Sequence, residues 1–370
     1  MKALLAISAV LFSVSTARAT NVPPVQTVFI IVLENHDWSE FKGNANAPFL
    51  NGTLLPTASY CEQYYNPPGL HPSEPNYLWL EAGTNFGIFD DNDPSANHLN
   101  TTGHLAAQLR SAGISWKTYQ EDITGTVVPL QSVNGYAPKH DPFVFFDDMT
   151  GTNDPANAYG LAHIRPYSEL AGDLASNSIA RYNFITPNLC HDGHDVCAPE
   201  TNAVRETDDW LAGEVPKILH SAAYSNNGAL FITWDESEDG DGPIGMIVLS
   251  PLARGGGYNN NIRYTHSSFL RTMQEIFGVS PWLGDAANAT DLSDLFTKFV
   301  IQPAVTPSND GFHFTVTGVV PGRTNLAQAS ANLATWETIS TNKSPSNSFE
   351  IVDRVMTNHH VRFYRIMEAP

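Results

Sequence analysis

Five short apolar stretches constrain the fold of this chain more than any other feature. Each has the length of a buried strand, and none alternates apolar with polar residues: 28–33, 114–119, 182–186, 229–234 and 244–249. Continuous apolar strands are typical of a parallel sheet covered on both faces, because both sides of each strand are then buried. The sequence therefore predicts an α/β domain with a mostly parallel sheet flanked by helices.

Two helical patterns lie between or after these strands. In TTGHLAAQLRSAG we predict a helix capped by Thr101 or Thr102 and ended by Gly113. In THSSFLRTMQEIFG we predict a helix capped by Thr265 and ended by Gly278. Strands that alternate with helices support the α/β assignment.

The two ends of the chain differ from its middle. Lys2, an apolar run over 4–14 and the small residues around Arg18 form the pattern of a secretory signal peptide, which predicts cleavage after Ala19 and a secreted, periplasmic or cell-surface protein. After about residue 300, short strand patterns separated by turns predict a small all-β, sandwich-like module. The predicted units are a signal peptide at 1–19, a catalytic domain at 20–300 and the β module at 301–370. Its segments ANLATWETI and RFYRI resemble the C-terminal repeats of many secreted bacterial proteins, which suggests surface attachment or sorting.

The charge balance argues against a nucleic-acid partner. The 370 residues include 38 Asp and Glu but only 19 Lys and Arg, a formal net charge of −19, whereas binding to a phosphate backbone needs clustered basic residues. No segment after the leader reaches about 18 uninterrupted apolar residues, so we predict no transmembrane segment. A surface this acidic would repel an anionic substrate unless a metal ion or a helix N-terminus reverses the local field.

Three cysteines are too few for a disulfide framework. Cys190 and Cys197 are candidates for a disulfide that closes a short loop in an oxidising compartment. Such a pairing leaves Cys61 without a partner.

Polar residues follow three of the predicted strands at the point where each strand ends. Glu34 and Asn35 follow the first strand, Asp235 and Glu236 follow the fourth, and the histidine-rich loop 188–195 follows the third. Ligands of open α/β sheets bind beyond the carboxyl ends of the strands, so we expect these side chains to converge on one crevice. Their oxygens suit one divalent ion, either Ca²⁺, Mg²⁺ or Mn²⁺, and Zn²⁺ remains an alternative.

The segment HPSEPNYLWLEAG places Ser73 at the start of an expected helix and Asn76 one turn further on. A hydroxyl at this point lies among unpaired backbone N–H groups, where a phosphate would also be held. Ser73 is thus a candidate nucleophile, and Asn76 a candidate donor to a phosphoryl oxygen. The alternative is an ordinary serine cap with Pro75 in the first turn.

Several histidines are candidates for proton transfer near neutral or mildly acidic pH. They are His140 in KHDPFVFF, His191 and His194 in TPNLCHDGHDVC, and His266 in YTHSSF. The spacing in the second segment fits no standard structural zinc site. The alternative for His191 and His194 is a solvated loop. A histidine such as His140 or His266, taken alone, is more often structural than catalytic.

Seven segments together resemble the phosphoesterase family that includes secreted acid phosphatases and bacterial phospholipases C. They are VLENHDWSEF, HPSEPNYLWLEAG, GISWKTYQED, KHDPFVFFDD, TPNLCHDGHD, WDESEDGDGPIGMIVLSP and YTHSSFLRTMQEIFG. The resemblance spans about 27–296 and implies an alkaline-phosphatase-like fold. It implies Ser73 as nucleophile and metal ligand, together with the ligands Glu34, Asn35, Asp235 and Glu236.

The resemblance is weaker at a second metal position. Asn188 and Asp192 match the place where two-metal relatives carry an Asp and a His ligand, and His266 matches the last histidine of that pattern. Because Asn188 is neutral and Asp192 replaces an imidazole, we expect one divalent ion rather than two.

The function expected from the resemblance is hydrolysis of phosphate monoesters by a secreted, metal-dependent acid phosphatase that forms a phosphoserine intermediate. One alternative is a phospholipase C or another phosphodiesterase. A second alternative is a non-catalytic adhesion protein whose acidic strand ends hold structural calcium.

Overall fold

A computed structural model describes residues 22–238, 240–296, 300–303, 310–319, 324–346, 348–355 and 361–368. The predicted signal peptide lies outside these residues. Within them, no helix has both the length and the apolar character needed to cross a membrane.

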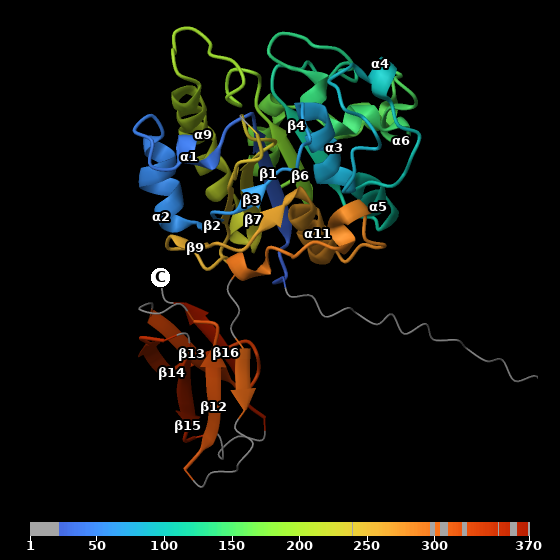
Figure 1. Ribbon diagram of the computed structural model, residues 1–370. Helices are drawn as coiled ribbons and strands as arrows, with labels where there is room; N and C mark the ends of the chain where they lie inside the picture. Colours follow the sequence, from blue (N-terminus) through green and yellow to red (C-terminus); the bar gives the residue numbers. More distant parts are fainter. Residues whose placement is uncertain are drawn as a thin grey trace, which may run out of the picture.

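An eight-stranded sheet forms the centre of the larger domain, in the order β5-β4-β6-β1-β7-β8-β2-β9 (Figure 1). Its strands are β1 (Thr27–Leu33), β2 (Ser59–Cys61), β4 (Trp116–Gln120), β5 (Ile164–Pro166), β6 (Tyr182–Thr186), β7 (Gly228–Trp234), β8 (Met246–Leu249) and β9 (Tyr258–Asn260). The five strands from β5 to β7 are parallel, whereas β8 is antiparallel to β7 and β2. The mostly parallel α/β fold is confirmed. The stretch 244–249 is the exception because its connection to β7 is too short for a parallel crossover.

Helices lie on both sides of this sheet (Figure 1). They are α1 (Trp38–Phe41), α2 (Leu55–Thr57), α3 (Ser73–Ala82), α4 (Pro94–Asn97), α5 (Leu105–Ser111), α6 (Asp147–Thr150), α7 (Ala158–His163), α8 (Leu170–Ser176), α9 (Ala203–Leu219), α10 (Ala222–Ser225) and α11 (His266–Phe277). Thr265 caps α11 in a capping box, and Gly278 ends it with φ +66°. Both predictions for this helix are confirmed.

The predicted start of α5 is wrong. The helix is capped by His104, whose ring nitrogen Nδ1 accepts from the backbone N–H of Ala107 at 3.3 Å, and neither Thr101 nor Thr102 is the cap. The buried His104 ring also bonds to Asp148 through Nε2 at 2.9 Å. This tertiary contact fixes the ring and so decides the cap.

Two central strands form the middle of the core. Every residue of β7 is buried, and so is every residue of β1 except Thr27. Their register pairs Thr27 with Gly228 and continues in step to Leu33 with Trp234. Each apolar side chain buried in this way contributes roughly 1.5–3 kcal/mol. The register also means that β1 and β7 end at the same level of the sheet.

The C-terminal residues form two three-stranded antiparallel sheets, β11-β12-β15 and β14-β13-β16. Their strands are β11 (Val300–Pro303), β12 (Phe312–Thr317), β13 (Thr324–Ser330), β14 (Glu337–Lys343), β15 (Ser348–Asp353) and β16 (Phe363–Glu368). Phe314 and Ile351 of one sheet share an apolar cluster with Ala327 of the other. The all-β module is thus confirmed, while its boundary at residue 301 and its role in attachment remain predictions.

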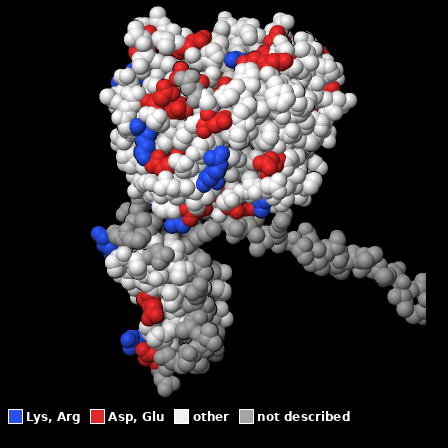
Figure 2. Space-filling view, in the orientation of Figure 1, with Lys and Arg blue, Asp and Glu red and all other residues white. Residues whose placement is uncertain are grey.

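Surface charge follows the acidic composition. On the face drawn in Figure 2, Lys and Arg side chains are scattered among Asp and Glu and do not merge into one basic surface on that face. With a formal net charge of −19, the overall field does not attract an anionic substrate, so local features of a site must hold it.

Candidate active site

The register of β1 and β7 brings Glu34 and Asp235 side by side at the carboxyl edge of the sheet. The backbone N–H of Asp235 donates to Leu33 O at 2.9 Å. In return, the N–H of Asn35 donates to Asp235 Oδ1 at 3.0 Å, across 200 residues of sequence. Asn35 has φ +36°, a conformation that Asn tolerates better than most residues. The first and fourth predicted strands therefore deliver their polar residues to one place.

Ser73, the first residue of α3, faces these carboxylates. Its Oγ donates to Glu34 Oε2 at 2.9 Å and lies 3.5 Å from Asn35 Oδ1. The residue is 1% exposed, and Pro72 occupies the N-cap position of the helix. The alternative of an ordinary serine cap is therefore wrong, because the hydroxyl is used toward Glu34 and not toward its own helix.

The oxygens around Ser73 form a suitable set of ligands for a cation. The amide of Asn35 lies 2.9 Å from Glu34 Oε2 and 3.2 Å from Asp235 Oδ1, with its oxygen facing these acceptors. Asp235 Oδ2 is buried without a hydrogen-bond partner. Such a group of oxygens is stabilised when a cation lies among them or when the amide turns its NH₂ inward. The residues therefore fit an oxygen-bound divalent ion.

Tyr77 and His140 complete the surroundings of Glu34. The Tyr77 hydroxyl donates to Oε1 at 2.5 Å, and His140 Nε2 lies 3.1 Å from Oε2. The two rings stack with centroids 5.2 Å apart. Burial alone would raise the pKa of Glu34, but His140 and the hydrogen bond from Tyr77 bring this pKa below its ordinary value. Glu34 is thus held as an ionised carboxylate that contacts both the serine and a histidine.

His140 lies between Glu34 and Asp192, whose Oδ2 is 3.3 Å from His140 Nδ1. Burial disfavours a charged imidazole here, but the two carboxylates outweigh it and raise the pKa of His140 to about 9. Burial raises the pKa of Asp192 to about 6. Donor atoms of Glu34, His140 and Asp192 all lie within 4.8 Å of one another, so these three side chains form a second place where a metal ion fits.

Asp235 and Glu236 are two further acidic groups close to Glu34. Burial, followed by the charges of Glu34 and Glu236, raises the pKa of Asp235 well above its ordinary value. Burial, followed by the charge of Glu34, raises the pKa of Glu236 to about 8. A bound cation would offset this repulsion, which again fits a metal site.

Asn76 holds Glu236 and is not free toward the site. Its Nδ2 donates to Glu236 Oε2 at 3.0 Å and to the carbonyls of Leu70 and Pro72 at 2.9 and 3.1 Å. Glu236 Oε2 also lies 2.6 Å from Nδ1 of His71. The NH₂ expected to face a phosphoryl oxygen is therefore committed to protein acceptors, so the geometry makes Asn76 a positioning residue for Glu236.

Asn188 and His191 bond to Asp122 and Glu121 and not to Ser73. Asn188 Oδ1 accepts the N–H of His191 at 3.0 Å, and its amide donates to Asp122 at 2.9 Å. His191 bonds to Glu121 at 2.8 Å. Of the pair matched to a second metal position, the structure therefore brings only Asp192 to the cluster.

His266 contacts the backbone of Asp235 and not its carboxylate. Its Nε2–H donates to the carbonyl oxygen of Asp235 at 2.6 Å, and Nδ1 lies 3.1 Å from the Tyr64 hydroxyl. Burial lowers the pKa of His266 to about 4. A neutral ring whose two nitrogens are both bonded in this way fixes the backbone at Asp235.

His194 and Lys139 lie nearer the surface of the site. Lys139 Nζ is 3.3 Å from His194 Nε2 and 3.2 Å from Asp91 Oδ2, while Asp91 Oδ1 accepts the N–H of Glu74 at 2.9 Å. The ring of His194 is 5.9 Å from that of His140. Lys139 therefore places a positive charge beside the start of α3.

A disulfide joins Cys190 and Cys197 and encloses the loop that carries Asp192 and His194. Cys61 is free and buried. The backbone of this loop is tied to the sheet, because the N–H of Glu34 donates to Asp192 O at 2.9 Å. The disulfide thus restrains one side of the site.

Two site residues were missed in the sequence, although each is next to a residue that was predicted. Tyr77 follows Asn76 and lies four residues after Ser73, which places both on one face of a helix. Lys139 precedes His140. The helical spacing could have identified Tyr77, whereas the place of Lys139 depends on its contact with Asp91.

A serine at a helix start, beside buried carboxylates and a histidine at the carboxyl edge of a parallel sheet, suits a hydrolase that acts on esters through a nucleophilic hydroxyl. The model of the Phosphoesterase family matches residues 52–280, more than half of the chain. The chain belongs to this family. The matched segment includes Ser73, His140, Asp192 and Asp235, whereas Glu34 precedes it.

Two relatives and one solved structure illustrate the similarity. The chain is 29% identical to a phosphatidylinositol-3-phosphatase of Mycobacterium tuberculosis, over 75% of this chain and 85% of that protein. It is 30% identical to an acid phosphatase of Aspergillus niger, over 58% of this chain and 50% of that protein, so it spans half the length of the fungal relative. A structure of an alkaline phosphatase superfamily protein from Vibrio parahaemolyticus has a TM-score of 0.47 and 10% identity, covering 87% of this chain and 83% of the other.

Proposed function

We propose that the chain is an exported acid phosphatase that hydrolyses phosphate monoesters through a phosphoserine at Ser73. One observation carries this proposal. Glu34 Oε2 lies 2.9 Å from Ser73 Oγ and 3.1 Å from His140 Nε2, so a nucleophile and a proton donor meet at one carboxylate oxygen. Nucleophilic catalysis requires this kind of grouping.

The oxygens that would hold one divalent ion come from Ser73, Glu34, Asn35 and Asp235, and Glu236 lies beside them. When bound, such an ion polarises the serine hydroxyl and neutralises charge on the phosphoryl oxygens. Oxygen ligands favour Ca²⁺, Mg²⁺ or Mn²⁺, with Zn²⁺ as the alternative.

In the first half-reaction Ser73 Oγ attacks phosphorus, and its proton passes to Glu34 Oε2. The bond between phosphorus and the alcohol oxygen breaks in line with the attack, and that oxygen takes a proton from His140. With its pKa raised to about 9, His140 carries this proton at neutral and mildly acidic pH. The N-terminus of α3 stabilises negative charge that develops beside Ser73.

In the second half-reaction water attacks the phosphoserine. His140, now neutral, takes a proton from this water. The bond from Ser73 Oγ to phosphorus breaks, and the serine oxygen recovers its proton from Glu34. Inorganic phosphate leaves, and both residues return to their starting states.

A monoester substrate and an oxidising location have separate support. The names of both relatives describe enzymes that remove a phosphate group, which favours a monoester over a diester. The Cys190–Cys197 disulfide is the kind of bond that persists outside the cytosol. The predicted signal peptide agrees with such a location.

The test is turnover of p-nitrophenyl phosphate by the wild type, by Ser73→Ala and by Ser267→Ala. Ser267 is also a 1% exposed serine near the start of a helix, but it bonds to Trp79 and Asp285 and serves as the matched control. We expect Ser73→Ala to lose at least about 10³-fold in kcat and Ser267→Ala to retain turnover.

A labelled phosphate trapped on Ser73 by acid quench would demonstrate the intermediate directly. Wild-type turnover by Ser73→Ala would exclude the nucleophile assignment. Faster hydrolysis of bis(p-nitrophenyl) phosphate or phosphatidylcholine would favour a diesterase such as a phospholipase C. Metal binding without any hydrolysis would favour the non-catalytic alternative.

A further inference from the structure

Lys139 is a cation at the candidate active site that has no role in the reaction steps given above. It precedes His140, whose Nε2 lies 3.1 Å from Glu34 Oε2, the oxygen that accepts the Ser73 hydroxyl. Its side chain is 20% exposed, so it is largely buried but still reaches the surface. A buried ammonium is costly unless polar or negative groups surround it.

Two side chains hold this ammonium beside the first turn of α3. Nζ lies 3.2 Å from Asp91 Oδ2 and 3.3 Å from His194 Nε2. The other oxygen of Asp91, Oδ1, accepts the backbone N–H of Glu74, the residue after Ser73, at 2.9 Å. One carboxylate group therefore separates the ammonium of Lys139 from the N-terminus of the helix that begins at Ser73.

The ammonium has one donor left for a ligand. It carries three N–H groups in all. Asp91 accepts one of them, and Nε2 of His194 accepts another, because Nδ1 of the same ring bonds to Asp195 at 2.9 Å. Nζ has no third hydrogen-bond partner among the residues that the structure describes. The third N–H is therefore available to an oxygen of the substrate.

The charge of Lys139 acts on the carboxylate that accepts the Ser73 hydroxyl. Burial opposes the ammonium form, but Glu34 and Asp91 outweigh it and raise the pKa of Lys139. The charge of Glu34 contributes more to this rise than that of Asp91, although only Asp91 is hydrogen-bonded to Nζ. Lys139 thus remains positive and lies close enough to Glu34 to affect a phosphoryl group bound at Ser73.

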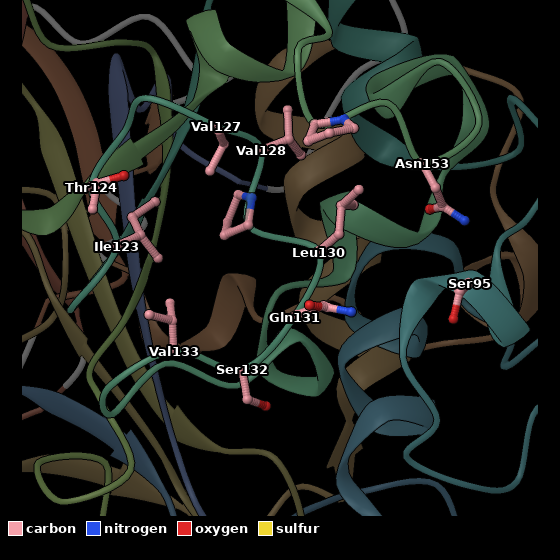
Figure 3. Close-up of a pocket in the computed structure, with 12 residues that line it drawn as sticks. Ser95, Ile123, Thr124, Val127, Val128, Leu130, Gln131, Ser132, Val133 and Asn153 are labelled. Atoms are coloured by element: carbon pink, nitrogen blue, oxygen red, sulfur yellow. The ribbon is translucent and has the colours of Figure 1, made fainter.

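The cavity in Figure 3 offers no comparable charge. It has a volume of about 640 Å³, with apolar side chains such as Ile123 and Val127 and polar ones such as Ser95 and Asn153 around it. Each described residue that lines it is uncharged. A phosphate in this cavity would lose its hydration without gaining an ion pair, which is unfavourable. The phosphate is therefore expected beside Lys139 and not in the cavity.

We propose that Lys139 binds one nonbridging oxygen of the phosphoryl group and thereby selects monoesters over diesters. This inference rests on the proposed function and names a residue that determines its substrate class. Above a second pKa of about 6, a monoester shares two negative charges among three nonbridging oxygens. A diester has one negative charge, and a second ester group replaces the third oxygen. The ammonium therefore gains a charge-assisted hydrogen bond from a monoester that a diester does not provide.

The experiment compares p-nitrophenyl phosphate with bis(p-nitrophenyl) phosphate, because the two esters release the same alcohol. At about pH 7.5, where the monoester is a dianion, Lys139→Gln should lower kcat/KM for the monoester. We expect a loss of at least about tenfold for the monoester and a change of less than about threefold for the diester. If the wild type does not cleave the diester, its Ki as a competitive inhibitor takes the place of kcat/KM. The Ki of inorganic phosphate should rise at least about tenfold as well.

Two further variants separate a role in binding from a role in folding. Lys139→Arg keeps the positive charge and should retain most of the preference for the monoester. Asp91→Asn leaves Lys139 in place and keeps an acceptor for the N–H of Glu74, but it removes the charge that holds the ammonium. This variant should lose part of the preference. A purely structural role of Lys139 would lower the turnover of both esters equally and leave their ratio unchanged.

Lys117→Gln is the matched control. Lys117 forms an ion pair with Asp173 and is 23% exposed, close to the value for Lys139, but Asp173 lies on α8. This variant should keep the wild-type ratio and the wild-type Ki of phosphate. An unchanged ratio in Lys139→Gln would overturn the inference, while turnover of p-nitrophenyl phosphate by the wild type would still support the proposed function. Absence of that turnover in the wild type would refute the proposed function and the inference with it.

Discussion

Removal of the hydrogen bond from Tyr77 to Glu34 tests the role of Glu34, because the substitution leaves the reacting atoms unchanged. Tyr77→Phe removes only the hydroxyl that donates to Glu34 Oε1 at 2.5 Å. Both residues are fully buried, so water does not replace the lost donor. Glu34 Oε1 then has one fewer partner, and the carboxylate is free to turn away from Ser73 and His140.

The expected magnitude comes from the charge on Glu34. A hydrogen bond to an ionised group contributes about 1.5–3 kcal/mol. If the whole contribution is needed to hold Glu34 in the transition state, kcat/KM falls roughly 10- to 100-fold. The fold should be destabilised by a similar free energy, so stability must be measured separately.

Tyr182→Phe is the matched control. Its hydroxyl also donates to a buried carboxyl group, Glu81 Oε1, at 2.5 Å, but that pair lies outside the site. Steady-state kinetics with p-nitrophenyl phosphate and urea unfolding should show that both variants lose stability, whereas only Tyr77→Phe loses activity. If Tyr77→Phe kept wild-type kcat/KM, orientation of Glu34 would play no part in catalysis.

Stability and metal affinity should respond in defined ways to three other changes. Burial raises the pKa of Glu81 from 4.5 to about 8, so the folded state binds the proton more tightly than the unfolded state does. The free energy of unfolding should therefore fall as pH rises from about 4.5 to about 8. Thermal melts across this pH range should show that Glu81→Gln abolishes the fall. Replacement of Cys190 and Cys197 by Ser should cost about 2–3 kcal/mol in urea unfolding, because a short loop is no longer closed, and reductant should affect only the wild type. Asp235→Asn should weaken calorimetric binding of a divalent ion at least about tenfold. Asp241→Asn should not, because Asp241 accepts the backbone N–H of Gly69 and an Asn side chain still can; equal affinities of the two variants would contradict the ligand assignment.

The long apolar strands could be predicted because burial on both faces makes nearly every residue of such a strand apolar. β1, β6 and β7 agree with the predicted stretches to within one residue at either end. β2 and β9 have only three residues each, and β9 has the polar sequence Tyr258–Asn260. Such short strands form because a neighbouring edge offers hydrogen bonds, so their own sequence does not reveal them.

Part of the site could be predicted for a related reason. Glu34 and Asp235 follow buried strands, and the carboxyl ends of neighbouring parallel strands meet at one edge. Asn188, His191 and His266 share the composition of site residues but bond elsewhere in the fold. The residue types alone do not distinguish a group that faces the crevice from one that supports it from behind.

The sequence by itself determined that this chain forms a mostly parallel α/β sheet, because continuous apolar strands are stable only when both of their faces are covered. It also determined which strand ends carry oxygen ligands. The tertiary structure alone decided that Ser73 serves the site and does not cap its helix, because that choice depends on the position of Glu34, 39 residues away. A hydrogen bond across such a separation is set by strand register and helix packing, which no local pattern records.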